Sequence, residues 1–153
     1  MSNQTSNDFQ SRLTEAQGFT GSTPEEISKS LELSREKVRG IIDEIKNIPE
    51  NERDYELNIV LVKAYVHVNN IIDAMVALVD LSVSDKERCD NDPLWNYYMG
   101  HCLLSHPKKP KYDTAYNYFV KFLELAEEKQ FDDEFLVASA QAMVRNIPMM
   151  YGV

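Results

Sequence analysis

Large apolar side chains recur every three or four residues through most of the chain beyond about residue 34. That is the spacing of one face of an α-helix, whereas a half-buried strand alternates apolar and polar residues. The most regular stripes lie within residues 34–48, 71–81 and 112–128. Only five glycines occur in 153 residues, and no Asn-Gly or Asp-Gly turn separates short apolar runs, which disfavours a β-sandwich or barrel. The pattern predicts an all-α fold.

Capping residues and prolines mark where the expected helices begin and end. Thr23-Pro24 and Asp92-Pro93 are typical helix starts, and Ser34 is a further candidate N-cap. Residues 59–68 have the composition of a buried strand, but the length of the apolar run favours a helix. The expected helices are residues 24–31, 34–48, 54–68, 71–81, 93–104, 112–128 and 132–146.

The two ends of the chain differ from the middle. Residues 1–21 are rich in Ser, Thr, Asn and Gln, so we predict a mostly mobile tail, of which Phe9, Leu13 and Phe19 could dock a part. The expected organisation is therefore a tail over residues 1–21, an N-terminal helix pair over 22–48, two further helix pairs over 54–129, and a C-terminal helix with an apolar tail over 131–153.

Two of the helix pairs can be aligned if the second contains three extra residues. The aligned positions are Leu61, Tyr65, Ala74 and Leu78 in the first pair and Met99, Leu103, Ala115 and Phe119 in the second. This pattern resembles the tetratricopeptide repeat, a helix pair of about 34 residues with small and large residues at fixed offsets. Gly100 matches the family glycine, whereas Val62 replaces it in the first copy, and Asn58 and Asn96 stand where the family has tryptophan.

Residues 48–57 and 92–95 also look like segments of small bacterial tetratricopeptide proteins. The resemblance covers about residues 54–129 and implies a short α-α superhelix of about two repeats with flanking capping helices. Any other α-helical bundle of this size would show similar apolar spacing. Because two repeats are fewer than the three usually needed to share a core, residues 34–48 and 132–146 are expected to complete the stack.

The resemblance implies a binding groove lined by the first helix of each pair. The groove positions that we single out are Lys63, His67, Leu94, Tyr97, His101 and Leu104. They imply an adaptor or scaffold that binds a peptide or protein, although Leu94 and Tyr97 also fit ordinary core packing. The family's clamp for chaperone C-termini needs several Lys, Arg and Asn residues, and Lys63 alone does not provide it.

The residues that would carry chemistry are sparse. No Gly-rich phosphate loop, nucleophile elbow or catalytic carboxylate pair is recognisable, so we expect no enzyme and no cofactor. Cys102 and His106 have the spacing of two ligands on one helix face, but no second close pair accompanies them, and we predict no metal site. The two cysteines are expected to be free thiols.

A second function class rests on residues 24–42, which are similar to a helix-turn-helix and would offer Arg35, Lys37 and Arg39 to a major groove. The position of the turn holds Glu32, where glycine is preferred. Residues 20–48 contain five basic and six acidic side chains, and the whole chain has a formal charge of −9, which disfavours binding to phosphates. Nucleic-acid recognition therefore stands as the alternative.

Neither a secretory signal nor an apolar run of bilayer length is recognisable, which predicts a cytoplasmic protein without a membrane partner. The terminal segment Ile147–Val153 is apolar and rich in methionine. It could fold back onto the last helix or join two copies of the chain, because methionine-rich surfaces adapt to many partners.

Overall fold

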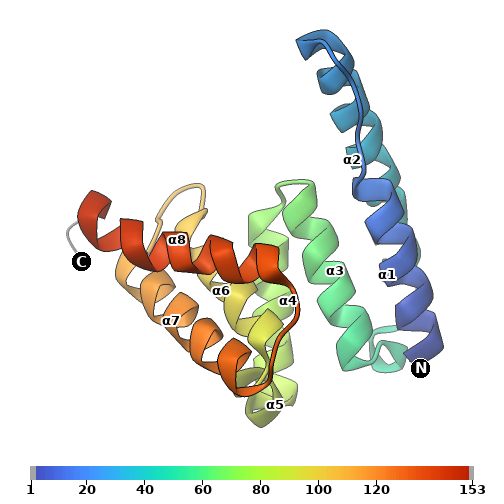
Figure 1. Ribbon diagram of the computed structural model, residues 1–153. Helices are drawn as coiled ribbons and strands as arrows, with labels where there is room; N and C mark the ends of the chain where they lie inside the picture. The colour runs from blue at the N-terminus through green and yellow to red at the C-terminus, as the bar shows by residue number, and fades with distance from the viewer. Residues whose placement is uncertain (1–2, 152–153) are drawn as a thin grey trace. The chain divides into compact units, whose positions relative to one another are not determined.

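The structure, a computed structural model, describes residues 3–151, which form helices joined by short connections and contain no strand (Figure 1). Met1, Ser2, Gly152 and Val153, which belong to the two predicted tails, lie outside the described residues. The helices are α1 (Asn3–Gln17), α2 (Pro24–Lys46), η1 (Glu50–Glu52), α3 (Tyr55–His67), α4 (Ile71–Ser84), α5 (Lys86–Asp90), α6 (Pro93–Leu104), α7 (Tyr112–Glu128) and α8 (Glu134–Tyr151). The predicted all-α fold is confirmed.

The chain forms two compact units, Met1–Ala74 and Met75–Val153, so the boundary falls inside α4. Unit 1 contains α1, α2 and α3, which pack against one another, and unit 2 contains α5 to α8 and most of α4. This division cuts through the first predicted helix pair. None of the described helices is both long and apolar enough to cross a bilayer.

The predicted N-terminal tail is instead the helix α1. Leu13 is fully buried, and Ser6 and Ala16 lie on the same buried side of the helix. The Arg12 guanidinium donates to the Glu44 carboxylate of α2, which holds the pKa of Glu44 below its usual range. The segment looked mobile because the buried face of α1 contains mostly small residues, and only its contacts with α2 and α3 show that they are core.

The structure also corrects the prediction of two helices over residues 24–48, because α2 is continuous. Thr23 caps it as expected and accepts from the backbone N–H of Glu26. Ser34 is no N-cap: it is buried in mid-helix, and its hydroxyl donates to the backbone carbonyl of Ala16. Since Glu32 also lies within this helix, residues 24–42 contain no turn and do not form a helix-turn-helix.

Helices α3 and α6 begin in the same way. Asp54 and Asp92 are their N-caps, and each side chain accepts from a backbone N–H of the first turn. Four residues later, the amides of Asn58 and Asn96 donate to the carbonyls of Asp54 and Asp92. Both pairs are 38 residues apart, the same interval as that from Val62 to Gly100. The asparagines at the family's tryptophan positions therefore close the first turn of each helix.

In unit 2, the core lies between α6, α7 and α8. Phe119, Phe122 and Ala140 are fully or almost fully buried, and the indole N–H of Trp95 donates to the Leu78 carbonyl. Helices α6 and α7 approach closely at Gly100, where an added Cβ would lie 3.2 Å from the Phe119 ring. A side chain at this position would press on the Phe119 ring.

The last helix is longer than predicted. It starts at Glu134 after the acidic cap Asp133, as expected, but continues to Tyr151 with Pro148 inside it rather than ending near Asn146. Proline removes a single backbone donor, and its place in the final turns limits the cost to the helix. The ring of Tyr151 stacks on that of Tyr112 with centroids 3.7 Å apart, which holds the end of α8 beside the start of α7.

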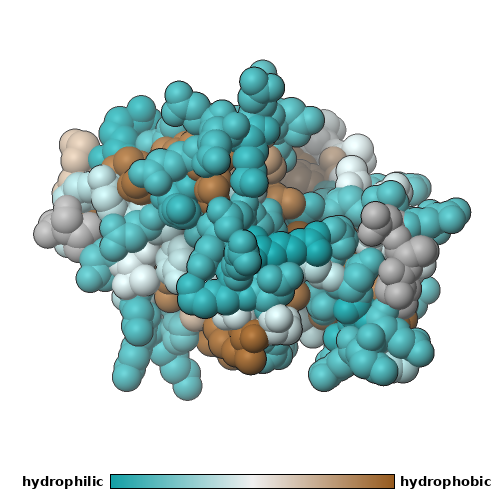
Figure 2. Space-filling model, turned by 90° about the horizontal axis from the view of Figure 1, so that it is seen from below, coloured by the Kyte–Doolittle hydropathy of each residue, from teal (hydrophilic) through white to brown (hydrophobic). Residues whose placement is uncertain are grey.

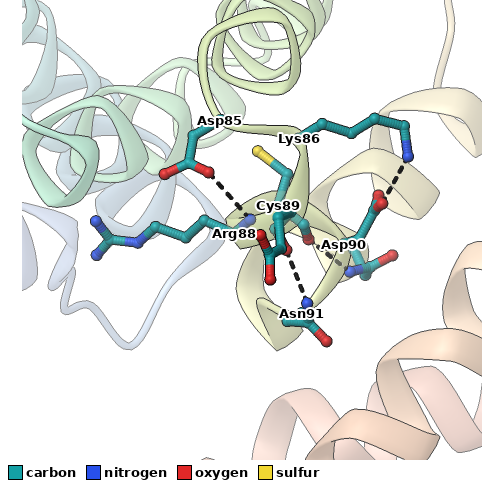
Figure 3. A network of polar contacts seen from close by, with 8 residues as sticks. Asp85, Lys86, Arg88, Cys89, Asp90 and Asn91 are labelled. Atoms are coloured by element: carbon teal, nitrogen blue, oxygen red, sulfur yellow. Dashed lines mark hydrogen bonds and ion pairs between the residues drawn. The ribbon is translucent and has the colours of Figure 1, made fainter.

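Part of residues 82–92, the connection expected between the helices 71–81 and 93–104, is also helical. Figure 3 shows the short helix α5, which Asp85 caps by accepting from the backbone N–H of Arg88, and in which Lys86 pairs with Asp90 at 2.6 Å. The Asn91 amide donates to the Glu87 carbonyl, and that of Asn96 reaches the Cys89 carbonyl from α6. These local bonds form a compact corner before α6.

We predict that Gly100→Val destabilises the protein by about 1–3 kcal/mol, because the added methyl groups must displace the Phe119 ring. Urea unfolding measures the change. Gly40→Ala is the matched control: nothing lies within 4 Å of the added Cβ, and the better helix propensity of alanine should stabilise α2 by up to about 1 kcal/mol. Equal effects of the two substitutions would contradict the close contact at Gly100.

Candidate functional site

The six predicted groove residues divide between the two units. In unit 1, Lys63 and His67 on α3 are bonded to the N-terminal helices. The Lys63 ammonium donates to the Gln10 side-chain carbonyl of α1 at 2.8 Å, and His67 Nε2 lies 3.0 Å from the Ser34 hydroxyl of α2. This side of α3, which the family resemblance assigns to a partner, is therefore used within unit 1.

Ser34 and His67 have the spacing of a nucleophile and its base, but their hydrogen bonds run in the wrong direction for that role. The Ser34 hydroxyl donates its one proton to the Ala16 carbonyl, so it accepts from His67 Nε2–H. A serine nucleophile would instead donate to the imidazole. Burial lowers the pKa of His67, and the positive charge of Arg35 lowers it further. The pair joins α1, α2 and α3 and is structural.

In unit 2, the predicted groove residue Tyr97 belongs to the core. It is only 7 % exposed, its ring lies edge-on to Phe119 and Phe122, and its hydroxyl is 3.1 Å from that of Ser139 on α8. His101 stacks on Tyr97, and burial lowers its pKa. Tyr97 is therefore a core residue, which was the alternative interpretation given for it above.

Leu94 and Leu104 lie near the two ends of α6 and are half-buried. They are partly accessible, unlike Tyr97 between them. The side of α6 that holds Tyr97 packs on the aromatic core residues of α7 and reaches Ser139 of α8. An open apolar surface of unit 2 therefore lies on another helix.

Two of the cavities within the described residues belong to different units, the first to unit 1 and the second to unit 2. That of unit 1 has about 460 Å³, and the residues that line it include Arg39, Lys46, Asp43 and Asp73, which carry both signs of charge. That of unit 2 has about 450 Å³ and lies between α5, α6 and α7. Its Asp90 is paired with Lys86, and its Asn96 amide is bonded to two backbone carbonyls. In the cavity of unit 2, these polar groups already bond within the chain. In the cavity of unit 1, the basic and acidic side chains are equal in number.

The cysteines and His106, which could act as nucleophiles or metal ligands, are buried or hydrogen-bonded within the chain. Both cysteines are buried and form no disulfide, and burial raises the pKa of Cys102 to about 12, which keeps it protonated at neutral pH. His106 Nδ1 accepts from the backbone N–H groups of Lys108 and Lys109 and so orders the loop after α6. Among residues 3–151, no three His, Cys, Asp or Glu side chains are grouped in a way that could hold a metal ion.

The most accessible regular apolar surface is on α4. Val76, Val79 and Val83 are 53 %, 46 % and 83 % exposed, and their spacing places them on one face, here called the valine face. Leu78 and Leu81 on the same helix are buried. Figure 2 shows one side of the molecule, a mostly hydrophilic surface that apolar side chains reach in separate places. The valines of the valine face lie along a single helix.

The apolar residues of α4 indicate in the sequence that this helix has a second apolar side. The helix predicted over residues 71–81 rested on the stripe that is buried in the structure. Helix α4 has apolar residues on more than one side, and its charged residues within the described chain are Asp73 and Asp80. A helix that is apolar all round is normally covered on all sides. An exposed stripe on such a helix indicates a contact surface for another molecule.

Comparisons with models of protein families, with curated proteins and with solved structures found no match to this chain.

We predict that the free energy of unfolding falls between pH 7 and pH 5.5. Unfolded histidines take up a proton near pH 6.5, whereas burial delays protonation of folded His67 and His101 to lower pH. The unfolded chain therefore binds more protons in this window, and stability is lost as the pH falls. The double variant His67→Gln/His101→Gln should show a smaller loss in urea unfolding at the two pH values. An unchanged pH dependence would contradict the assignment.

Proposed function

We propose that this chain is a non-catalytic protein-binding module that receives a helix of another protein on the valine face of α4. The observation that carries this proposal is the exposure of Val76, Val79 and Val83 along one helical stripe. A partner helix with apolar residues at the same three- and four-residue spacing could bury these side chains. Each fully buried valine would contribute up to about 1.5–3 kcal/mol, before the cost of association.

The charge of α4 favours a helix of a different protein as the partner, rather than α4 of a second copy. Asp80 directly follows Val79, near the middle of the stripe, and α4 has no Lys or Arg. Symmetric pairing of two α4 helices would bring two Asp80 carboxylates together, which is unfavourable. A partner helix with Lys or Arg beside its apolar stripe would instead pair with Asp80.

Relationship to the tetratricopeptide repeat remains part of the proposal. It is supported by the equivalent Asp54–Asn58 and Asp92–Asn96 helix starts and by the close helix contact at Gly100. The proposed binding face is, however, on the second helix of the first pair, because residues of the expected groove are bonded within their own units. Two buried cysteines that form no disulfide are consistent with work in a reducing compartment such as the cytoplasm.

Site-specific photocrosslinking in the native cell tests the proposal. With the crosslinking residue at position 79, we expect adducts whose partner peptide is amphipathic and carries Lys or Arg. Adducts should fall several-fold when Val76→Lys and Val83→Lys are added. Position 33 is the matched control, because Leu33 is 57 % exposed on α2, outside the valine face.

Two results would contradict the proposal. Equal crosslinking from positions 33 and 79 would show that any exposed apolar residue suffices. Adducts at position 79 that persist in the lysine variants, with circular dichroism showing that these remain helical, would show that the valines do not form the contact.

A further inference from the structure

Besides the valine face, unit 2 exposes large apolar side chains at both ends of α8. Phe135, in the first turn, is 80 % exposed. At the other end, Met149 and Met150 are 81 % and 68 % exposed. The 18 residues of α8 separate the two ends by about 27 Å, so one partner side chain cannot cover both.

The apolar residue at the first end is surrounded by negative charge. The last turn of α7, the connection to α8 and the first residue of α8 contain five exposed carboxylates and one exposed lysine, namely Glu127, Glu128, Asp132, Asp133, Glu134 and Lys129. We call Phe135 with these residues the acidic end of unit 2. The carboxylates of Glu127 and Glu128 lie at the C-terminus of a helix, where the helix dipole attracts a cation.

The methionines at the second end lie beside positive charge. Lys108, Lys109 and Lys111 are exposed in the connection between α6 and α7. The stacked rings of Tyr112 and Tyr151 hold the end of α8 against the residue that follows this connection. The bonds from Lys108 and Lys109 to His106 order its backbone. We call Met149, Met150 and these three lysines the basic end.

We propose that the acidic end of one copy of this chain docks on the basic end of a second copy. Each end has exposed apolar residues, and the charges around them are of opposite sign, so a head-to-tail contact buries the apolar residues and pairs the charges. A two-fold symmetric contact between like ends would oppose charges of the same sign. We propose that the two ends, which lie about 27 Å apart, engage two different copies. The contact is then heterologous and adds further copies as an open chain or a closed ring, whereas a two-fold pair that joined both ends at once would stop at a dimer.

This contact is independent of the valine face and of the partner proposed for it. It does not use α4, and its failure would leave the proposed function intact. The double variant Val76→Lys/Val83→Lys should reduce crosslinking from position 79 but leave self-association unchanged.

Charge reversal at each end, followed by mixing, tests the head-to-tail contact. The probe is the full chain itself, followed by sedimentation velocity over a range of protein concentrations. Wild-type chains should form species beyond dimers as the concentration rises, and added salt should weaken the association. Lys108→Glu/Lys109→Glu and Glu128→Lys/Asp132→Lys should each weaken it by about ten-fold or more. Asp133 is left unchanged because it caps α8.

A mixture of the two variants should associate again. The intact acidic end of the first variant meets the intact basic end of the second, which recreates the native contact, while the reversed ends are complementary to each other. Phe135→Ser should weaken self-association when it is added to the otherwise wild-type chain, and it should weaken association in the mixture of the two charge-reversed variants. A wild-type chain that stays monomeric throughout, or variants that associate no better mixed than alone, would overturn the proposal.

Discussion

The main constraint on this structure is that α4 is apolar on more than one side, while the chain covers only part of it. Leu78 and Leu81 are buried, whereas Val76, Val79 and Val83 remain open to solvent. Exposure of these valines brings no benefit to the isolated fold, because the same positions could hold polar residues at no packing cost. The arrangement is favourable once another helix covers the stripe.

The helix starts and the helical class were predictable from local chemistry. Thr23-Pro24 and Asp92-Pro93 act as expected, because a capping side chain and a first-turn proline depend only on their neighbours in sequence. The extent of α1 and the continuity of α2 were not predictable in the same way. They depend on Leu13, Ala16 and Ser34, whose burial requires contacts between segments far apart in the sequence.

The candidate site shows the same limit. Periodicity correctly placed Lys63, His67, Tyr97 and His101 on helices, but it could not reveal what covers each helix face. The neighbours of α3 are α1 and α2, and Tyr97 bonds to Ser139 of α8. These helices use the side chains that a family groove would offer to a partner. The valine face became apparent only when the structure showed which of the many apolar residues of α4 are buried.

The central claim is that the valine face binds an amphipathic helix, and NMR titration of the labelled chain tests it most directly. The probe is a synthetic helical peptide with leucines at three- and four-residue spacing flanked by lysines, compared with a scrambled peptide of the same composition. We predict that the backbone amide signals of α4 shift when the amphipathic peptide is added and do not shift with the scrambled peptide. Shifts concentrated on α3 or α6, or equal shifts with both peptides, would contradict it.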